Sequence, residues 1–286
     1  MAELPPSPLG LYGPGTYKRS RSKKTAALDN YLRLLPYLLP TDRTLSSAFL
    51  WHPDLHSENI FVNPEDRSEV VGIIDWQSSE ILPLFDHARQ PYFLDYDGPQ
   101  FVGIDAPPFP ENFDQLDLSA KAQAQALYFK QSLSALYRRL IYQTNTPLYE
   151  AMEFRETMSF NMMLFAQSLL IDGEALYQSS CLDLAEEWHN LPGVQASGNP
   201  PFPLQFSADE IDRIEKDADS TVKGMGLMRD LEESLGSLWP EKGVVKPEEY
   251  EEAKWRLQRA KADIIPRLTS SESERAEWER VWPFDP

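Results

Sequence analysis

Cysteine is almost absent from this chain, since Cys181 is the only one among 286 residues. A single thiol cannot form an internal disulfide, and so low a cysteine content is typical of a reducing compartment. We therefore expect an intracellular protein. Cys181 falls in a segment of helical periodicity with no paired histidine nearby, so we expect it to pack in a core.

Long apolar runs are also lacking. No stretch approaches the roughly 18 consecutive apolar residues that would cross a bilayer. The two most hydrophobic windows, residues 32–39 and 162–171, are interrupted by proline or polar residues. We expect no membrane span. The content of 42% hydrophobic and 12% aromatic residues nevertheless predicts a folded, globular chain.

Positive charge is scarce, because 27 Lys and Arg face 45 Asp and Glu, which gives a net charge of −18. Such a surface repels phosphate backbones, so we expect no nucleic-acid partner. One exception is residues 18–24, which carry five positive charges in seven positions. A run of this kind is usually a solvated face, and we favour that interpretation over a phosphate contact.

The chain divides, on its composition, into a short leader and one long domain. Residues 1–24 are rich in proline and glycine and then basic, without the apolar core of a signal peptide or the helix of a mitochondrial presequence. We expect an irregular basic leader there, carrying no visible targeting signal. Residues 25–286 are expected to form a single domain with a helical C-terminal extension.

Most of that domain reads as helix. Apolar residues recur at helical spacing in residues 26–39, 118–144, 147–172, 174–191, 207–234, 246–265 and 271–282. Ser207 and Glu210 predict a capping box at one of these helix starts. Residues 98–112 and 192–203 are proline-rich and are expected to be connectors. Trp278 and Trp282, one turn apart, are expected to clamp the last helix. The fold class is therefore α+β and predominantly helical.

The chemistry is expected at a small β-hairpin. Residues 60–62 and 70–74 are β-like, with a turn-rich segment between them. Asp54 and Asn59 precede the first strand, and Asp75 follows the second. Because a hairpin brings these two ends side by side, the three side chains are expected to meet. Two carboxylates and an amide oxygen suit Mg²⁺, and a remaining carboxylate can accept a hydroxyl proton during phosphoryl transfer.

The spacing of His52, Asp54 and Asn59 is H-x-D-x-x-x-x-N, which with a hairpin and a following aspartate resembles the catalytic segment of the protein-kinase fold. The sequence Ile-Ile-Asp-Trp-Gln at 73–77 looks like the aminoglycoside phosphotransferase and choline kinase branch of that superfamily. The wider stretch 50–99 resembles a fungal subgroup, the altered-inheritance-of-mitochondria protein 9 type. The resemblance implies a kinase-like C-terminal lobe with a small catalytic β-hairpin.

The resemblance also implies roles for five residues. Asp54 would be the catalytic base, while Asn59 and Asp75 would bind Mg²⁺ and through it the phosphates of ATP. His52 would be a structural histidine that braces the backbone around Asp75, and Asp86 would anchor the catalytic loop without touching substrate.

The implied reaction is an ATP- and Mg²⁺-dependent transfer of phosphate to the hydroxyl of a small molecule. An amine-bearing alcohol is one option, with Asp95, Asp97 and Asp114 as candidate carboxylates for its amine. A mitochondrial location is implied by the resemblance alone, and protein partners are not indicated.

Kinase-like enzymes also need a Gly-rich loop and a strand lysine upstream of the catalytic loop. Only 53 residues precede Asp54, and their one glycine-rich feature, Gly13-Pro14-Gly15, has neither that pattern nor a lysine-bearing strand after it. We expect that the N-terminal lobe is missing from this chain and that the chain is truncated.

Two other functions stay open at this point. The chain is alternatively a catalytically inactive kinase-fold protein that binds or scaffolds a partner. A metal hydrolase is the third option, since His52, Asp54 and His56 alternate and Asp75 or His87 would complete a Zn²⁺ site.

Overall fold

The computed structural model describes residues 10, 13, 17–99, 103–239 and 245–284. It divides into two compact units: unit 1 is Met1–Leu38 with Met162–Pro286, and unit 2 is Leu39–Asn161. The described elements are mostly helical with two small sheets, so the predicted α+β class is confirmed. Among the helices within the described ranges, none is both long and apolar enough to cross a membrane.

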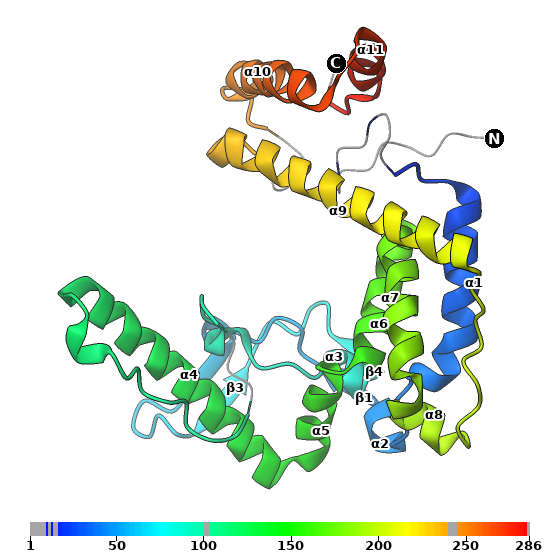
Figure 1. Cartoon of the computed structure of the whole chain (residues 1–286). Helices are drawn as coiled ribbons and strands as arrows, with labels where there is room; N and C mark the ends of the chain where they lie inside the picture. The colour runs from blue at the N-terminus through cyan, green and yellow to red at the C-terminus, as the bar shows by residue number, and fades with distance from the viewer. Residues whose placement is uncertain (1–9, 11–12, 14–16, 100–102, 240–244, 285–286) are drawn as a thin grey trace. The chain divides into compact units, whose positions relative to one another are not determined.

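Unit 1 is built from helices (Figure 1). Its principal helices are α1 (Arg21–Leu38), α7 (Glu174–Glu187), α8 (Pro192–Ala196), α9 (Ala208–Leu235), α10 (Tyr250–Leu268) and α11 (Glu272–Val281), with the 3₁₀ turns η4 (Ser168–Leu170), η5 (Trp188–Asn190) and η6 (Gly236–Leu238). Helix α6 (Met158–Gln167) enters the unit at Met162. Helix α1 begins five residues before the predicted residue 26, so the last four residues of the expected irregular leader are helical.

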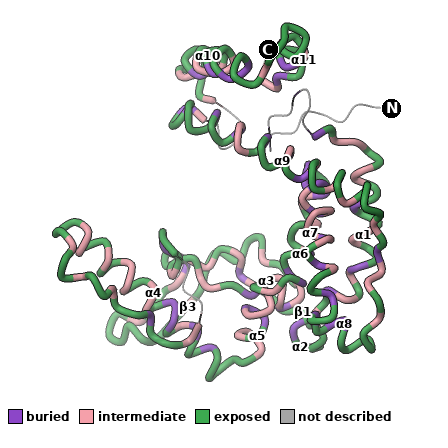
Figure 2. The backbone as a smooth tube through the Cα atoms, viewed as in Figure 1, coloured by how far each residue is buried: buried purple, intermediate pink, exposed green. Residues whose placement is uncertain are grey.

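The main core of unit 1 lies where α1 and α7 face each other. Buried positions recur along both helices (Figure 2), and Leu34, Tyr177 and Leu184 are fully enclosed. Cys181 is buried in the same cluster, as its helical pattern predicts. Helix α8 approaches α1 closely at Gly193, where a Cβ atom would come within 2.2 Å of the Tyr37 carbonyl oxygen. Only glycine fits such a contact.

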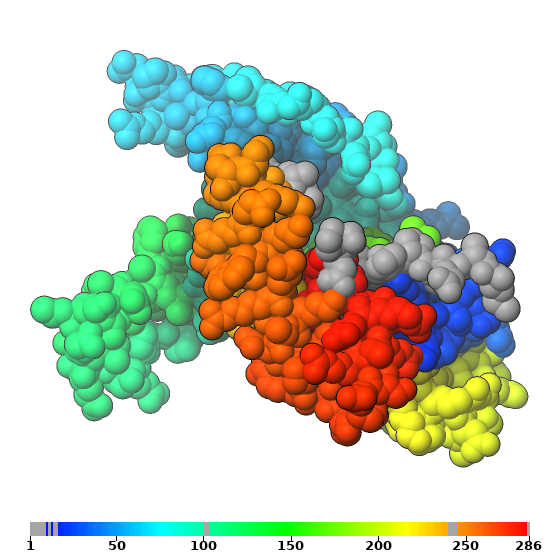
Figure 3. Space-filling model, turned by 90° about the horizontal axis from the view of Figure 1, so that it is seen from above, coloured from blue at the N-terminus to red at the C-terminus, as the bar shows by residue number. Residues whose placement is uncertain are grey.

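A second core of unit 1 joins α9, α10 and α11. The predicted capping box at the start of α9 is confirmed, because Ser207 Oγ accepts from the Glu210 N–H while the Glu210 carboxylate accepts from the Ser207 N–H. Leu231, Trp278 and Trp282 are buried together in this core, as expected for the two tryptophans. Figure 3 shows the surfaces of α10 and α11, orange to red, lying against each other.

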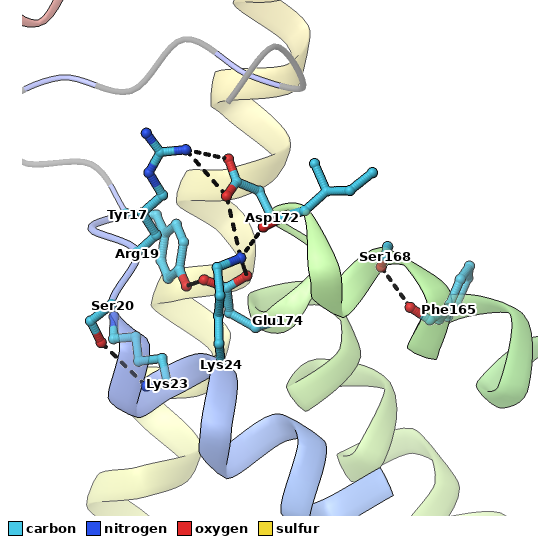
Figure 4. Close-up of polar contacts among 10 residues, drawn as sticks. Tyr17, Arg19, Ser20, Lys23, Lys24, Phe165, Ser168, Asp172 and Glu174 are labelled. Carbon is cyan, nitrogen blue, oxygen red and sulfur yellow. Dashed lines mark hydrogen bonds and ion pairs between the residues drawn. The ribbon is translucent and has the colours of Figure 1, made fainter. Parts of the chain in front are cut away.

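The basic run near the N-terminus is tied to acidic residues of α7 and the turn before it (Figure 4). Arg19 Nη1 pairs with Asp172 at 3.1 Å, and Lys24 Nζ pairs with Glu174 at 2.8 Å. The Asp172 and Glu174 side chains are only 2% and 1% exposed. The prediction of a solvated face is therefore wrong for Arg19 and Lys24, because partners some 150 positions away neutralise them.

Tyr17 completes this cluster from the residues before α1. Its hydroxyl donates to Glu174 Oε1 at 2.6 Å. Burial, together with the neighbouring Glu174 carboxylate, raises the pKa of Tyr17 well above its usual value. The hydroxyl therefore stays protonated and acts as a donor.

Unit 2 carries all four described strands. Antiparallel pairing joins β1 (Ala48–Trp51) to β4 (Glu80–Pro83) and β2 (Ile60–Val62) to β3 (Val70–Ile73). Its helices and turns are α2 (Arg43–Ser46), η1 (Ser57–Asn59), α3 (Leu84–His87), η2 (Tyr92–Leu94), η3 (Phe113–Gln115), α4 (Leu118–Thr144), α5 (Thr146–Arg155) and the first residues of α6. The core buries Leu45, Leu84, Ile141 and Met152.

The observed helices differ from the predicted ones in two places. The helix expected over 147–172 stops at Arg155 and restarts at Met158, because Thr157 Oγ1 accepts from the Phe160 N–H and caps a new helix. The connector expected over 192–203 begins with helix α8, in which Pro192 occupies the first turn, where proline needs no N–H partner.

Candidate active site

The predicted hairpin is present and brings the two ends of the candidate site together. Ile60 pairs with Ile73 in the β2–β3 ladder. One step further along, the Ile74 N–H donates to the Asn59 carbonyl at 3.0 Å. The last residue of the candidate catalytic loop therefore lies opposite the residue that precedes Asp75.

His52 ties the start of the loop to the same point. Its Nε2 lies 2.8 Å from the Ile74 carbonyl oxygen. Because a carbonyl only accepts, Nε2 must carry the proton. The ring is 8% exposed and lies edge-on to Trp76 at 4.9 Å. Its Nδ1 is buried without a hydrogen-bond partner among the described residues.

Asn59 closes the loop from inside. Its side chain is 5% exposed, and Nδ2 donates to the Asp54 backbone oxygen at 2.9 Å. The same Nδ2 lies 3.2 Å from His56 Nε2. Since Nδ2 can only donate, His56 Nε2 accepts, and Asn59 Oδ1 is left free of these contacts. Such an arrangement fixes the loop around one amide.

The Asp54 carboxylate faces outward and is 59% exposed. Its Oδ2 lies 3.5 Å from His56 Nε2, which accepts from Asn59 and so donates no hydrogen bond to the carboxylate. His56 thus lies beside both Asp54 and Asn59, whereas its alternation with His52 and Asp54 predicted only a zinc ligand. Its spacing of three residues from Asn59, within one turn, was the available signal.

Asp75 adopts a backbone conformation that is uncommon for a residue other than glycine. Its φ is +60°, in the left-handed region. The side chain is exposed and makes no hydrogen bond or ion pair with another described residue. Backbone conformations of this kind concentrate at functional sites, and Asp75 has a free carboxylate at the end of a strand.

Asp86 lies in α3, and its carboxylate makes no hydrogen bond to the candidate loop among the described residues. Its backbone oxygen accepts from Arg155 Nη1 at 2.7 Å. The neighbouring His87 makes the close contacts instead: its Nε2 accepts from the Leu82 N–H at 3.1 Å, and its ring stacks on Trp51 at 5.5 Å. The anchoring role of Asp86 stays a prediction.

The three carboxylates considered for an amine-bearing substrate all lie in unit 2. All three are exposed, and Asp95 accepts from Gln90 Nε2 at 3.2 Å. No group of three His, Cys, Asp or Glu side chains within the described ranges is placed to hold a metal ion. The cluster that a zinc hydrolase requires is therefore not formed by those residues.

The loop and the hairpin lie within the part of the chain that matches a known family. Residues 15–89 match the phosphotransferase enzyme family. The resemblance inferred from the motif is thereby confirmed.

Fungal proteins are similar to this chain. The chain is 32% identical over 124 residues to a subtelomeric hrmA-associated cluster protein of Aspergillus fumigatus, covering 43% of this chain and 24% of that protein. It is 26% identical over 209 residues to altered inheritance of mitochondria protein 9, mitochondrial, of Saccharomyces cerevisiae, covering 70% of this chain and 32% of that one. The Zygosaccharomyces rouxii protein of the same name is 24% identical over 206 residues, covering 68% of this chain and 32% of its own.

These matches cover between about a quarter and a third of the relatives' own lengths. No solved structure matches the chain significantly.

Proposed function

We propose that this chain takes part in Mg²⁺-dependent transfer of a phosphoryl group from ATP to the hydroxyl of a small molecule. The observation that carries the proposal is the series of hydrogen bonds from His52 to Ile74, from Ile74 to Asn59 and from Asn59 to Asp54. This series gathers the H-x-D-x-x-x-x-N loop and the residue before Asp75 at one end of a hairpin. The match to the phosphotransferase family supports the same conclusion.

The donor atoms fit a hard cation. Asn59 commits Nδ2 to protein acceptors, so Oδ1 is the atom left for a ligand. The exposed Asp75 carboxylate has no competing partner among the described residues. Oxygen donors of this kind suit Mg²⁺, and we assign Asn59 and Asp75 as the residues that would hold it.

Asp54 is the residue we assign as general base. Its carboxylate is exposed to an incoming substrate, while its backbone is held by Asn59. Bound Mg·ATP would supply the phosphoryl group: the substrate oxygen bonds to the terminal phosphorus as the bond to the bridging oxygen breaks, and ADP leaves. Asp54 would accept the proton that the substrate hydroxyl loses.

The test compares substitutions in the purified protein. Asp54→Asn should lower transfer from γ-labelled ATP to a mixture of small hydroxylated compounds by about 10²–10⁴-fold, because the proton acceptor is lost. Asp75→Ala should also abolish transfer and weaken Mg·ATP binding. The matched control is Asp183→Asn, an exposed aspartate of unit 1, which should transfer at the wild-type rate. Unchanged turnover in both site variants would refute the proposal.

A binding or scaffold protein is the second candidate, and a specific observation favours it. None of the four strands that the structure describes carries the lysine that kinase-like enzymes use to hold the nucleotide phosphates. Calorimetric titration with Mg·ATP separates the two functions. Absence of binding at millimolar nucleotide, together with absence of transfer, would favour the scaffold.

We also infer a mitochondrial location by similarity, since the yeast relatives carry that word in their names. Fractionation of the source cells, with the native protein followed by antibody, tests this. Co-sedimentation with a matrix marker is expected, and recovery with cytosolic markers alone would contradict it.

A further inference from the structure

A pocket of about 150 Å³ lies beside the candidate catalytic loop, entirely within unit 2. Pro53 and Leu55, the two residues that flank Asp54, both line it. Successive Cα atoms are about 3.8 Å apart, so the wall of the pocket begins one residue to either side of the proposed base. The pocket therefore adjoins the backbone of the proposed base, whose own carboxylate is exposed beside the lining.

The size and lining of the pocket suit a ring. A cavity of about 150 Å³ is large enough to hold benzene. Trp51, Tyr92 and Tyr137 supply aromatic surface, and the parallel stack with His87 fixes the plane of the Trp51 ring. Burial raises the pKa of Tyr137, so its hydroxyl is uncharged. An aromatic or other six-membered ring would find stacking partners here.

The charge of the pocket is unlike that of the chain as a whole. The chain carries a net charge of −18, yet the lining includes the Arg89 guanidinium and no aspartate or glutamate. Arg89 Nη1 donates to Tyr92 Oη at 3.2 Å, and Arg89 forms no ion pair with a carboxylate of the described residues. An arginine with free donors pairs readily with a carboxylate or phosphate, whereas an ammonium group beside it would be repelled.

We propose that this pocket binds the acceptor substrate, and that this substrate is a ring compound carrying an anionic group, held by Arg89, and a hydroxyl directed toward Asp54. The role of the hydroxyl rests on the proposed function. The preference for an anionic ring does not, because it is a property of binding alone. An amine-bearing alcohol is the competing chemistry that the test must exclude.

The experiment uses two probes that differ only in their charged group. They are 4-(hydroxymethyl)benzoate and 4-(hydroxymethyl)benzylamine, titrated into the protein by calorimetry, with tryptophan fluorescence as a second readout of contact with Trp51. We expect the benzoate to bind about tenfold more tightly than the benzylamine, or better. Arg89→Gln should weaken benzoate binding by about tenfold and leave benzylamine binding no weaker.

Arg43→Gln is the matched control. Arg43 is exposed at the start of α2 and does not line the pocket, so its replacement should leave both affinities at wild-type values. Circular dichroism of each variant verifies that the fold is kept. Arg89 is itself exposed, so its replacement is not expected to unfold the chain.

Three results of the binding experiment would overturn the proposal: no binding of either probe, equal or tighter binding of the benzylamine, or full benzoate affinity in Arg89→Gln. Failure of the proposed function is a separate result. Benzoate binding that depends on Arg89, without any transfer from Mg·ATP, would refute the phosphotransferase and keep the anionic-ring pocket. If the protein transfers phosphate to a hydroxyl compound and Arg89→Gln leaves that transfer unchanged, the phosphotransferase is kept and the anionic-ring pocket is refuted.

Discussion

The Asn59 side chain joins the candidate base to the candidate metal site. Nδ2 donates to the Asp54 backbone and to His56, while the backbone oxygen of Asn59 accepts from Ile74. The side-chain amide makes two of these contacts, and a hydrophobic or smaller side chain could not replace them. Its loss should therefore affect both the stability of the loop and the chemistry.

We predict that Asn59→Ala lowers the free energy of unfolding by about 1–3 kcal/mol, because two partly buried hydrogen bonds inside the loop are lost. It should also abolish phosphoryl transfer, because the oxygen assigned to Mg²⁺ is lost. Urea denaturation and the transfer assay measure the two effects. Asn190→Ala, at an exposed amide that pairs with Glu187, should cost no more than about 0.5 kcal/mol. A cost at Asn59 that equals the control would contradict the role given to its amide.

His87 makes stability depend on pH. Burial, the largest cause, lowers the pKa of its imidazole in the folded chain. As the pH falls below the ordinary value of about 6.5, the unfolded chain takes up a proton that the folded chain does not, so folding loses free energy. The stabilisation is complete above about pH 6.5 and declines on acidification.

We predict that His87→Gln reduces this decline, since glutamine can accept from the Leu82 N–H without titrating. The measurement is the free energy of unfolding by urea at pH 7, 6 and 5 for both proteins. The wild type should lose up to about 1.4 kcal/mol more per pH unit than the variant over this range. Parallel profiles would show that His87 does not titrate with folding.

At the scale of elements, Tyr17 before α1 and Lys24 in its first turn attach this end of α1 to α7 by a hydrogen bond and an ion pair. Tyr17 and Lys24 both contact Glu174, whose side chain is almost inaccessible (Figure 4). Removing one member of a buried ion pair leaves its partner without a counter-charge. The loss of stability is then larger than the stability that the pair itself contributes. We predict that Glu174→Ala lowers the free energy of unfolding by about 3 kcal/mol.

Chemical denaturation followed by tryptophan fluorescence measures that cost. Glu215→Ala, at an exposed glutamate of α9, is the control and should change stability by less than about 0.5 kcal/mol. If the two variants unfold alike, the cluster contributes nothing specific to the attachment of α1.

The elements differ in how far the sequence alone predicts them. Helix α4, the capped start of α9 and the β2–β3 hairpin follow from periodicity and turn residues close together in the chain, and all three were predicted. The pairing of β1 with β4 was not predicted, because Trp51 and Glu80 are brought together across 28 intervening residues that carry no local signal for it. The partners of Arg19 and Lys24 were missed for the same reason.

The candidate site likewise has features that the sequence predicts and features that it does not. The pairing of Asn59 with Ile74, the residue before Asp75, was predictable because one hairpin joins them. The left-handed backbone of Asp75 and the contacts of His56 depend on the folded loop, and spacing alone does not encode them. The pocket lined by Arg89 and Tyr137 is formed by side chains from separate elements, so no sequence motif predicts it.

At the scale of the whole molecule, the acidic surface opposes folding. Exposed carboxylates outnumber cations in a chain of net charge −18, and their mutual repulsion destabilises the compact state. Salt shortens the reach of that repulsion to about 10 Å at 0.1 M, whereas ion pairs removed from solvent are screened much less. The surface and the buried cluster should therefore respond differently to ionic strength.

We predict that raising sodium chloride from about 0.02 M to about 0.3 M increases the Tm by about 2–4 °C, equivalent to about 1 kcal/mol. The destabilisation caused by Glu174→Ala should stay the same at both concentrations, because Asp172 and Glu174 are nearly inaccessible. Differential scanning calorimetry of both proteins, repeated in potassium chloride to exclude a specific ion effect, gives the answer. A Tm that falls with salt would mean that exposed pairs such as Lys216 with Asp212 outweigh the repulsion between like charges.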